Sequence, residues 1–412
     1  MTIGVSGLWH LGCVLCASWA ELGHRVLGFD LDEQLLQNLR EGRPPIFEPG
    51  LEEALAHPKV SWAGSVQDLE QCEVVFIAID TPVDDQDRSL TRCLEEQMAM
   101  LGPLLPDGAL VVVSSQSPVG FCRKLRGLLQ DHNPTLELAY SPENLRLGEA
   151  LRCYREPGTV VIGAATEETA ARCRELFSPT QATLQCMSLE SAEMAKHGIK
   201  TFLAMRIVYT HEVASLCETT GADVSQVVAV MKSDPRIGMR AYLEPGVGFS
   251  GGTLGRDLRV LGSQGGDFFE QLWQRNAGRK DHIVRRLGSV GGKQIGVLGL
   301  TYKPGTSTLR RSLPLAVVCD LQAAGAFVRV YDPKADFSEL PEGIVVERAG
   351  SPLEAARQAD VLLLLTAWPE FLQQNWGQLA SVMKEPVVFD CKNCLDRATV
   401  EQAGFAYLSL GR

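Results

Sequence analysis

A glycine-rich turn lies near the start of the chain, where Gly7, Trp9, His10, Leu11 and Gly12 follow a short apolar stretch. Glycines between a strand and a helix let the helix N-terminus hold the pyrophosphate of a dinucleotide. The middle glycine of the usual G-x-G-x-x-G pattern, which lets the backbone approach the phosphates, is replaced by Trp9. Taken alone, the turn indicates either a dinucleotide site or a structural bend.

An acidic residue further along favours the dinucleotide site. Asp30 ends the second expected strand, 23 residues after Gly7, and an acid at about this distance binds the ribose 2′-hydroxyl in dinucleotide folds. Residues 30–33 include no arginine that could receive a 2′-phosphate, so NAD is favoured over NADP as the cofactor. The alternative is that Asp30 is a solvated residue at a strand end.

The N-terminal part of the chain has the strand and helix pattern that such a turn needs. We expect strands at residues 3–5, 25–29, 74–79, 110–114, 136–140 and 159–163, and helices at 13–23 and 33–39. Alternation of strands with helices predicts a parallel, doubly wound sheet.

A long helical pattern at residues 188–221 interrupts this alternation, and it is long enough to connect two domains and to form a dimer face. The alternating pattern then returns, with strands expected at 294–299, 327–331, 345–346, 361–365 and 386–390. We therefore predict an α/β fold with two Rossmann-like doubly wound parallel-sheet domains, joined by a helical central domain. The expected boundaries are 1–187, 188–290 and 291–412.

Composition excludes several other classes of protein. The 412 residues are 45% hydrophobic, which argues against disorder, and 39 basic against 50 acidic residues give a net charge of −11. A nucleic-acid binder or a protein of anionic membrane surfaces needs a broad positive field, so we expect neither nucleic acid nor membrane as a partner. The chain begins directly with an apolar strand and has no signal-peptide pattern, so a cytoplasmic protein is expected.

The twelve cysteines are scattered, which suits reduced thiols. Only Cys391 and Cys394 have the spacing of a metal or redox pair, and neither a second pair nor a histidine accompanies them. We therefore predict no metal site.

Several short motifs follow one another along the chain in a fixed order. They comprise residues 47–51, 80–83 and 141–146, Lys196, residues 234–238 and 248–252 with Asp257, residues 302–306 with Arg310, and residues 411–412. In these motifs and their spacing, the chain resembles the UDP-glucose/GDP-mannose dehydrogenase family over essentially its whole length. That family oxidises the C6 alcohol of a nucleotide sugar to a carboxylate with two NAD.

The resemblance implies a role for each matching residue. Lys196 and Asp257 match the pair that holds a water and takes the alcohol proton, and Glu143 matches the acid that helps hydrolyse a thioester. The other implied cofactor-binding residues are Thr81, Gln116 and Arg310, and the implied substrate-binding residues are Asn144, Leu145, Lys200, Arg236, Gly248, Phe249, Gly251 and Lys303. Arg236 matches an arginine that reaches the substrate of the neighbouring subunit, which implies a homodimer built on the long helix.

Four positions depart from the family pattern. Thr253 stands where the family has its nucleophilic cysteine, Lys200 replaces an asparagine, Gln116 a threonine and Leu147 a glutamate. A cysteine captures the intermediate aldehyde as a thiohemiacetal, and that route needs a thiolate from a thiol with a pKa near 8.5. A threonine hydroxyl without an activating base is a poor nucleophile, so we expect Thr253 to offer a hydrogen bond instead. We therefore predict a single two-electron alcohol oxidation.

The change to Lys200 affects the expected base. Lys196 and Lys200 are four residues apart and share one helix face. Two ammonium groups there raise the free energy of charging both, so the pKa of one should fall, which helps a lysine act as a base at neutral pH. Equally, Lys200 could bind a phosphate or carboxylate.

Two alternatives to this function stay open. One is NAD-dependent oxidation of a small or carrier-tethered hydroxy acid by a lysine base. The other is a catalytically inactive protein that binds NAD or a nucleotide sugar, against which Lys196, Asp257 and Glu143 argue.

Overall fold

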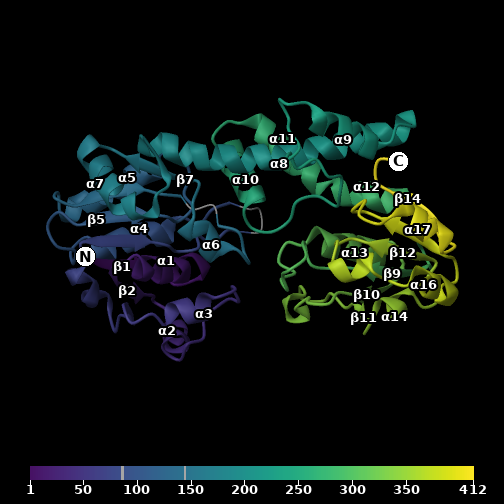
Figure 1. The fold of residues 1–412 in the computed structure, drawn as a ribbon, viewed down its shortest axis with the longest axis horizontal. Coiled ribbons are helices and arrows are strands. Elements are labelled where there is room, and N and C mark those ends of the chain that lie inside the picture. The colour runs from purple at the N-terminus through teal and green to yellow at the C-terminus, as the bar shows by residue number, and fades with distance from the viewer. Residues whose placement is uncertain (85–87, 143–144) are drawn as a thin grey trace. The chain divides into compact units, whose positions relative to one another are not determined.

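The structure, a computed structural model, describes residues 1–84, 88–142 and 145–412. It divides into two compact units, Met1–Gly198 and Ile199–Arg412 (Figure 1). Each unit is described by itself below.

The first unit is built on an eight-stranded sheet in the order β3-β2-β1-β4-β5-β6-β7-β8. Its strands are β1 (Thr2–Ser6), β2 (Arg25–Phe29), β3 (Val60–Trp62), β4 (Val74–Ile77), β5 (Leu110–Val113), β6 (Glu137–Tyr140), β7 (Thr159–Ala164) and β8 (Thr183–Met187). Its helices are α1 (His10–Glu21), α2 (Glu33–Arg40), α3 (Leu51–Leu55), α4 (Arg92–Leu101), α5 (Phe121–His132), α6 (Ala150–Arg155) and α7 (Glu167–Phe177), with 3₁₀ turns at Val66–Gln71 and Ser178–Thr180.

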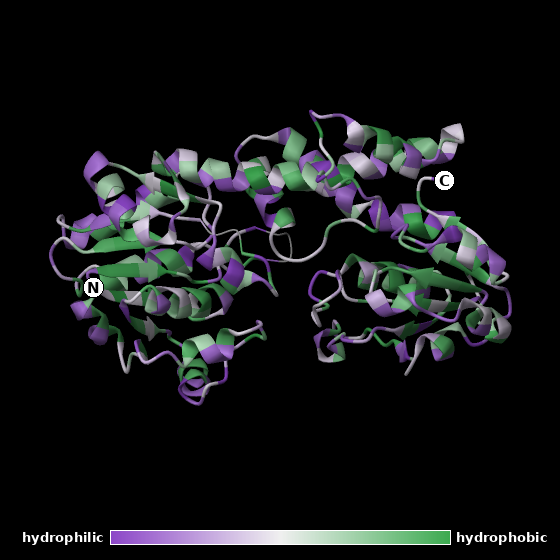
Figure 2. Cartoon of the chain, in the orientation of Figure 1, coloured by the Kyte–Doolittle hydropathy of each residue, from purple (hydrophilic) through white to green (hydrophobic). Residues whose placement is uncertain are grey.

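Helices cover both faces of this sheet, so its central strands are apolar throughout. Every residue of β4 and β5 is buried, as expected for parallel strands covered on both sides. Figure 2 shows strands of the first sheet largely in the hydrophobic colour. Trp19 of α1 packs on Phe76 and Phe177, with ring centroids 5.3 and 5.5 Å away, so α1 is fixed in the core just after the glycine-rich turn.

The helix α8 (Leu189–Thr220) has 32 residues and runs from the first unit into the second. The second unit continues with α9 (Val224–Ser233), α10 (Leu254–Ser263), α11 (Asp267–Ala277) and α12 (Arg279–Arg286). A six-stranded parallel sheet follows, in the order β11-β10-β9-β12-β13-β14. Its strands are β9 (Gln294–Leu298), β10 (Phe327–Tyr331), β11 (Glu347–Arg348), β12 (Val361–Leu364), β13 (Val387–Asp390) and β14 (Ala406–Ser409). The helices around it are α13 (Leu313–Ala323), α14 (Pro352–Ala356), α15 (Pro369–Leu372), α16 (Trp376–Val382) and α17 (Arg397–Gln402), with a 3₁₀ turn at Phe337–Glu339.

The predicted α/β architecture with two Rossmann-like sheets and a helical centre is confirmed. One strand pair departs from the parallel pattern, because β7 runs antiparallel to β6. The strand expected at 345–346 is wrong: Val345 is 80% exposed, and the ladder forms one step later, where Arg329 pairs with Glu347. The short strands β3, β8 and β14 were not predicted. The three-domain boundaries stay a prediction.

Among the described residues, no helix is both long and apolar enough to cross a membrane. No group of three or more His, Cys, Asp or Glu side chains in that part of the chain is arranged to hold a metal ion.

Candidate active site

The glycine-rich turn is shaped by close approaches that only glycine permits. Gly7 follows β1 with a φ of +93°, and a Cβ there would lie 2.7 Å from the backbone nitrogen of Ile79. A Cβ on Gly12, in the first turn of α1, would lie 1.8 Å from the carbonyl oxygen of Gly7. The two glycines therefore let α1 start directly behind the turn, with its N-terminus facing the carboxyl edge of the sheet.

The missing middle glycine is explained by the backbone. Trp9 has φ −70° and ψ −158°, which any residue adopts, and it caps α1. Its side chain is 46% exposed and lines a cavity of about 400 Å³ at the sheet edge. The replacement thus adds an aromatic wall to the cavity without straining the turn.

Asp30 lies in this cavity and helps to build it. Its Oδ2 accepts a hydrogen bond of 2.7 Å from the backbone of Leu8, and its Oδ1 accepts one of 3.0 Å from the backbone of Asp32. Asp32, Asp80 and Glu96 add further acidic side chains to the cavity lining. An acidic lining repels a 2′-phosphate, so the residues present fit NAD and disfavour NADP.

His10 connects the turn to a second part of the first unit. Its Nε2 lies 2.9 Å from Oε2 of Glu48, whose carboxylate is buried. Glu48 also accepts from the backbone of Gly148 and Ala150, at 2.9 and 2.8 Å, where α6 begins. Glu48 belongs to the quoted motif at residues 47–51, yet sequence reasoning gave it no role. Leu11 packs at the edge of the adjoining core.

The loops after β4 and β5 meet at the same edge. The hydroxyl of buried Thr81 donates to the carbonyl oxygen of Gln116 at 2.7 Å. Two residues of α8 bind the segment that follows Gln116. His197 is bonded to the Ser117 carbonyl at 2.9 Å, and Glu193 accepts from the backbone of Gly120 and Cys122. Burial raises the pKa of the Glu193 carboxyl.

The predicted base, Lys196, belongs to the same part of α8. It is only 2% exposed and lies between Glu193 and His197 in sequence. Lys200 is half-buried one turn further along the same helix.

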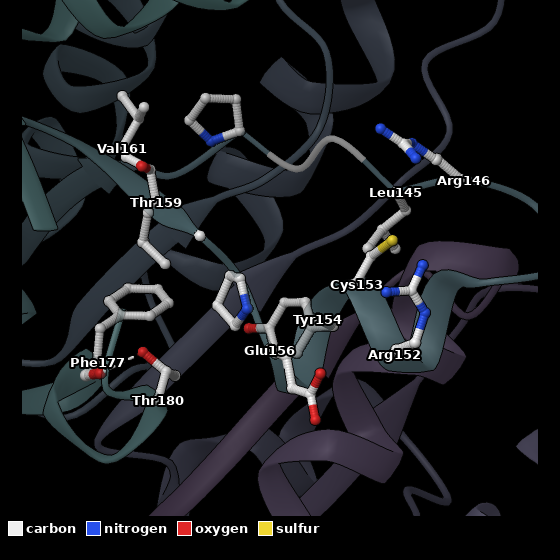
Figure 3. Close-up of a pocket in the computed structure, with 14 residues that line it drawn as sticks. Leu145, Arg146, Arg152, Cys153, Tyr154, Glu156, Thr159, Val161, Phe177 and Thr180 are labelled. Atoms are coloured by element: carbon white, nitrogen blue, oxygen red, sulfur yellow. Dashed lines mark hydrogen bonds between the residues drawn. The ribbon is translucent and has the colours of Figure 1, made fainter. Parts of the chain in front are cut away.

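Glu143 and Asn144 lie outside the described residues. Leu145, which follows them, lines a separate cavity of about 290 Å³ beside α6, together with Arg146 and Arg152 (Figure 3). Both arginines are largely exposed and pair with Glu149. We assign this cavity no function.

The second unit contains a cavity of about 380 Å³ that includes three predicted substrate residues, Gly248, Phe249 and Lys303. Gly248 has a φ of +117°, and a Cβ there would lie 2.6 Å from Leu313. The amide of Asn276 bonds both the backbone nitrogen and the carbonyl of Phe249, each at 2.9 Å. The Asn276 side chain of α11 therefore holds the backbone of Phe249 in this loop conformation.

The remaining wall of this cavity comes from α8, from the segment between α9 and α10, and from the loops after β9 and β13. The side chains involved are Ile207, His211, Tyr242, Glu244, Tyr302 and Lys392. Lys303 Nζ lies 5.9 Å from the Tyr302 ring centroid. Sequence reasoning missed His211 and Lys392, because their positions carry no local motif.

Thr253 immediately precedes α10 and is exposed, and its hydroxyl makes no capping hydrogen bond to the helix. Asp257 lies one turn into α10 and is 1% exposed. Gly251, with a φ of +82°, makes the bend just before them. Arg310 has an exposed side chain, and its backbone nitrogen donates to Glu339 at 3.2 Å.

Arg236 is the most exposed of the predicted substrate residues that the structure describes. Its side chain is 89% exposed and pairs with Asp234, with 2.6 Å between Nη2 and Oδ2.

Comparison with known proteins gives matches along the whole chain. Three domain models of the UDP-glucose/GDP-mannose dehydrogenase family match it: the NAD binding domain at residues 1–181, the central domain at 190–273 and the UDP binding domain at 296–397. The chain is 32% identical to UDP-glucose 6-dehydrogenase YwqF of Bacillus subtilis, covering 100% of this chain and 98% of that protein. It is 33% identical to the UDP-glucose 6-dehydrogenase of Rhizobium meliloti, over the full length of both.

A solved structure agrees with these matches. The UDP-glucose dehydrogenase of Pyrobaculum islandicum superimposes with a TM-score of 0.88 at 29% identity, covering 99% of this chain and 96% of that one.

Proposed function

The chain belongs to the UDP-glucose/GDP-mannose dehydrogenase family and is an NAD-dependent oxidoreductase acting on a CH–OH group, and we propose that it oxidises the primary alcohol of a UDP sugar once, to the aldehyde. The first sheet binds NAD, which accepts the hydride when bound. The UDP moiety occupies the cavity around Gly248, Phe249 and Lys303 in the second unit.

The observation that carries the single oxidation is Thr253. An oxidation to the acid in one active site normally requires capture of the aldehyde, and a hydroxyl without a base is a weak nucleophile. In the proposed step, neutral Lys196 takes the hydroxyl proton while the C–H bond gives its electron pair as hydride, so the carbon becomes a carbonyl. Asp257 orients the water of this proton transfer, and Glu143 has no thioester to hydrolyse.

A screen of UDP sugars tests the substrate. Thermal shift with NADH and UDP-glucose, or another UDP sugar, should raise the melting temperature, because a ligand that binds only the folded state stabilises it by mass action. Turnover is then followed as NADH appearance. Lys196→Ala should abolish turnover and leave NAD affinity nearly unchanged, whereas Lys124→Ala, an exposed lysine of α5, should leave both unchanged. Retained turnover in Lys196→Ala would remove Lys196 from the mechanism.

Replacing Thr253 tests the missing nucleophile. If this position alone limits the chemistry, Thr253→Cys should gain some second oxidation or accumulate a thioester detected as a mass increase. Thr253→Ser is the matched control and should gain neither. If Thr253→Cys changes nothing, Gln116, Lys200 and Leu147 have reshaped the site, and a small hydroxy acid becomes the better substrate.

The protein should act as a homodimer with Arg236 serving the partner's site. Phe202, Tyr209 and Leu216 recur at seven-residue spacing on α8 and are 55%, 51% and 64% exposed, which is an apolar stripe suited to a second copy of the chain.

Mixing two inactive variants tests the trans arginine. In a mixed dimer of Lys196→Ala with Arg236→Ala, one site keeps Lys196 and receives Arg236 from its partner, so about a quarter of the activity should return after subunit exchange. No recovery, or a stable monomer, would contradict this assembly.

A further inference from the structure

A buried guanidinium lies behind the wall of the cavity in the second unit. Arg279, the first residue of α12, is 4% exposed. Its Nε donates to the carbonyl oxygen of Gly246 at 3.1 Å, and its Nη1 donates to the hydroxyl of Ser215 at 3.1 Å. Gly246 lines the cavity. The backbone of Gly246 therefore lies between Arg279 and the cavity in which a ligand would bind.

The charge of Arg279 is not neutralised by a salt bridge within the described part of the chain. Its bonded partners are a carbonyl and a hydroxyl, and its Nη2 is buried without a hydrogen-bond partner. The nearby carboxylate of Glu218 is already bonded to His282 at 3.0 Å and to the backbone of Gly411 at 2.7 Å. Buried ions are normally paired with an opposite charge. Because Arg279 has no such pairing among the described residues, it retains a positive field, and solvent screens this field poorly because the group is buried.

A second cation lies on the same wall. A Cβ added to Gly246 would lie 3.2 Å from Nζ of Lys392, which lines the cavity. Gly246 therefore lies next to both Arg279 and Lys392. The acid in the lining, Glu244, is exposed, so solvent screens its charge. The wall at Gly246 is therefore electropositive.

His211 supports this description of the field. It lines the cavity one turn before Ser215, whose hydroxyl donates to the His211 carbonyl at 3.0 Å. Burial, with the charges of Arg279 and Lys392 in addition, holds the pKa of His211 well below its usual range. The imidazole is neutral at pH 7 and adds no third charge.

We propose that Arg279 determines specificity for the diphosphate of the substrate, its buried charge acting through the Gly246 wall on a ligand in this cavity. The inference rests on the proposed function, since the ligand is a nucleoside diphosphate sugar. Arg279 touches no ligand directly. It selects ligands by charge, whereas the residues lining the cavity select by shape.

A purely structural Arg279 would behave differently. Its two hydrogen bonds join α8 to the loop at Gly246, so loss of that connection would weaken every ligand of the cavity alike. Loss of charge alone would weaken only charged ligands. The measurement that separates the two roles is therefore UDP against uridine, by calorimetry on the full-length protein with saturating NADH filling the coenzyme site.

Arg279→Gln should weaken UDP binding about tenfold and change uridine binding by less than about twofold. Arg279→Lys, which keeps the charge, should retain most of the UDP affinity. Arg285→Gln, an exposed arginine of the same helix, should change neither ligand. Equal losses for UDP and uridine would overturn the proposal and leave Arg279 a packing residue.

A second variant keeps the test decisive if Arg279→Gln does not fold. Ser215→Asp would place a carboxylate beside Nη1 of Arg279, and it should weaken UDP binding while sparing uridine. If the unmodified protein prefers GDP or CDP to UDP, the proposed substrate is wrong, yet the ratio of nucleoside diphosphate to nucleoside still tests Arg279. If it binds no nucleoside diphosphate in this cavity, both proposals fail.

Discussion

In both sheets a glycine with positive φ follows the first strand of the unit, and the next residue donates to an aspartate. The two aspartates differ in their surroundings. Gly7 after β1 and Gly299 after β9 have φ values of +93° and +91°. Each donates its N–H to the last residue of the next strand, at 2.9 and 2.8 Å. The residue after each glycine donates to an aspartate, Asp30 or Asp332, in both cases at 2.7 Å.

The difference lies in what else reaches the aspartate. Asp332 also accepts from the backbone and hydroxyl of Thr301 and from the indole of Trp368, and it is 8% exposed. Asp30 is half-buried and opens onto the 400 Å³ cavity. A strand, a glycine and an acid therefore do not make a coenzyme site by themselves, because the carboxylate must keep a free acceptor.

The largest effect on stability should come from removing Trp368, which donates to Asp332 in the second sheet. Trp368→Ala should destabilise the protein by about 3–5 kcal/mol, since it removes a buried indole and a donor to Asp332. Urea unfolding measures this loss. Dinucleotide binding should stay at one NAD per chain. A second NAD bound in the variant would mean that Trp368 alone distinguishes the two sheets.

Asp332→Asn sharpens the same comparison. The amide cannot accept all the hydrogen bonds that reach the carboxylate, so stability should fall by about 1.5–3 kcal/mol while NAD affinity stays unchanged. Weaker NAD binding in this variant would contradict the assignment of the coenzyme to the first sheet.

Asp30→Ala should have the converse effect. We expect NAD binding to weaken about tenfold, since a hydrogen bond to a charged group is lost, and the gap between NAD and NADP to narrow. Calorimetry with both coenzymes measures it. Equal or tighter binding of NADP by the unmodified protein would overturn the role of Asp30.

Trp9→Ala should have the smallest effect. The backbone at this position is unstrained and the side chain is half exposed, so NAD affinity should change by about threefold or less. A much larger loss would make Trp9 a principal binding residue instead of a wall of the cavity.

Sequence patterns predicted the helices and strands well where the hydrophobic periodicity is strong. The strand at 25–29 and the helix at 188–221 follow from runs of apolar residues, and both are in the structure. Short edge strands were missed because three to five residues with partly exposed faces, as in β3 and β8, give little periodic signal. The antiparallel β7 is a matter of chain direction, which local pattern does not encode.

The candidate site divides in the same way. Gly7 and Asp30 were predicted from turn chemistry and spacing, and Gly248 from the resemblance to the family. Arg279 was not, since it acts from behind a loop that is distant in sequence. Contacts such as those between Arg279, Gly246 and Ser215 join segments more than thirty residues apart, and only the folded chain brings them together.

The most direct test of the account is the number of NADH formed per molecule of UDP sugar consumed. The unmodified enzyme is run to completion with excess NAD, NADH is read by absorbance, and the sugar product is identified by mass spectrometry. Because Thr253 cannot form a thioester, we predict one NADH and the aldehyde or its hydrate. Two NADH at comparable rates, with the uronic acid as product, would contradict the single oxidation.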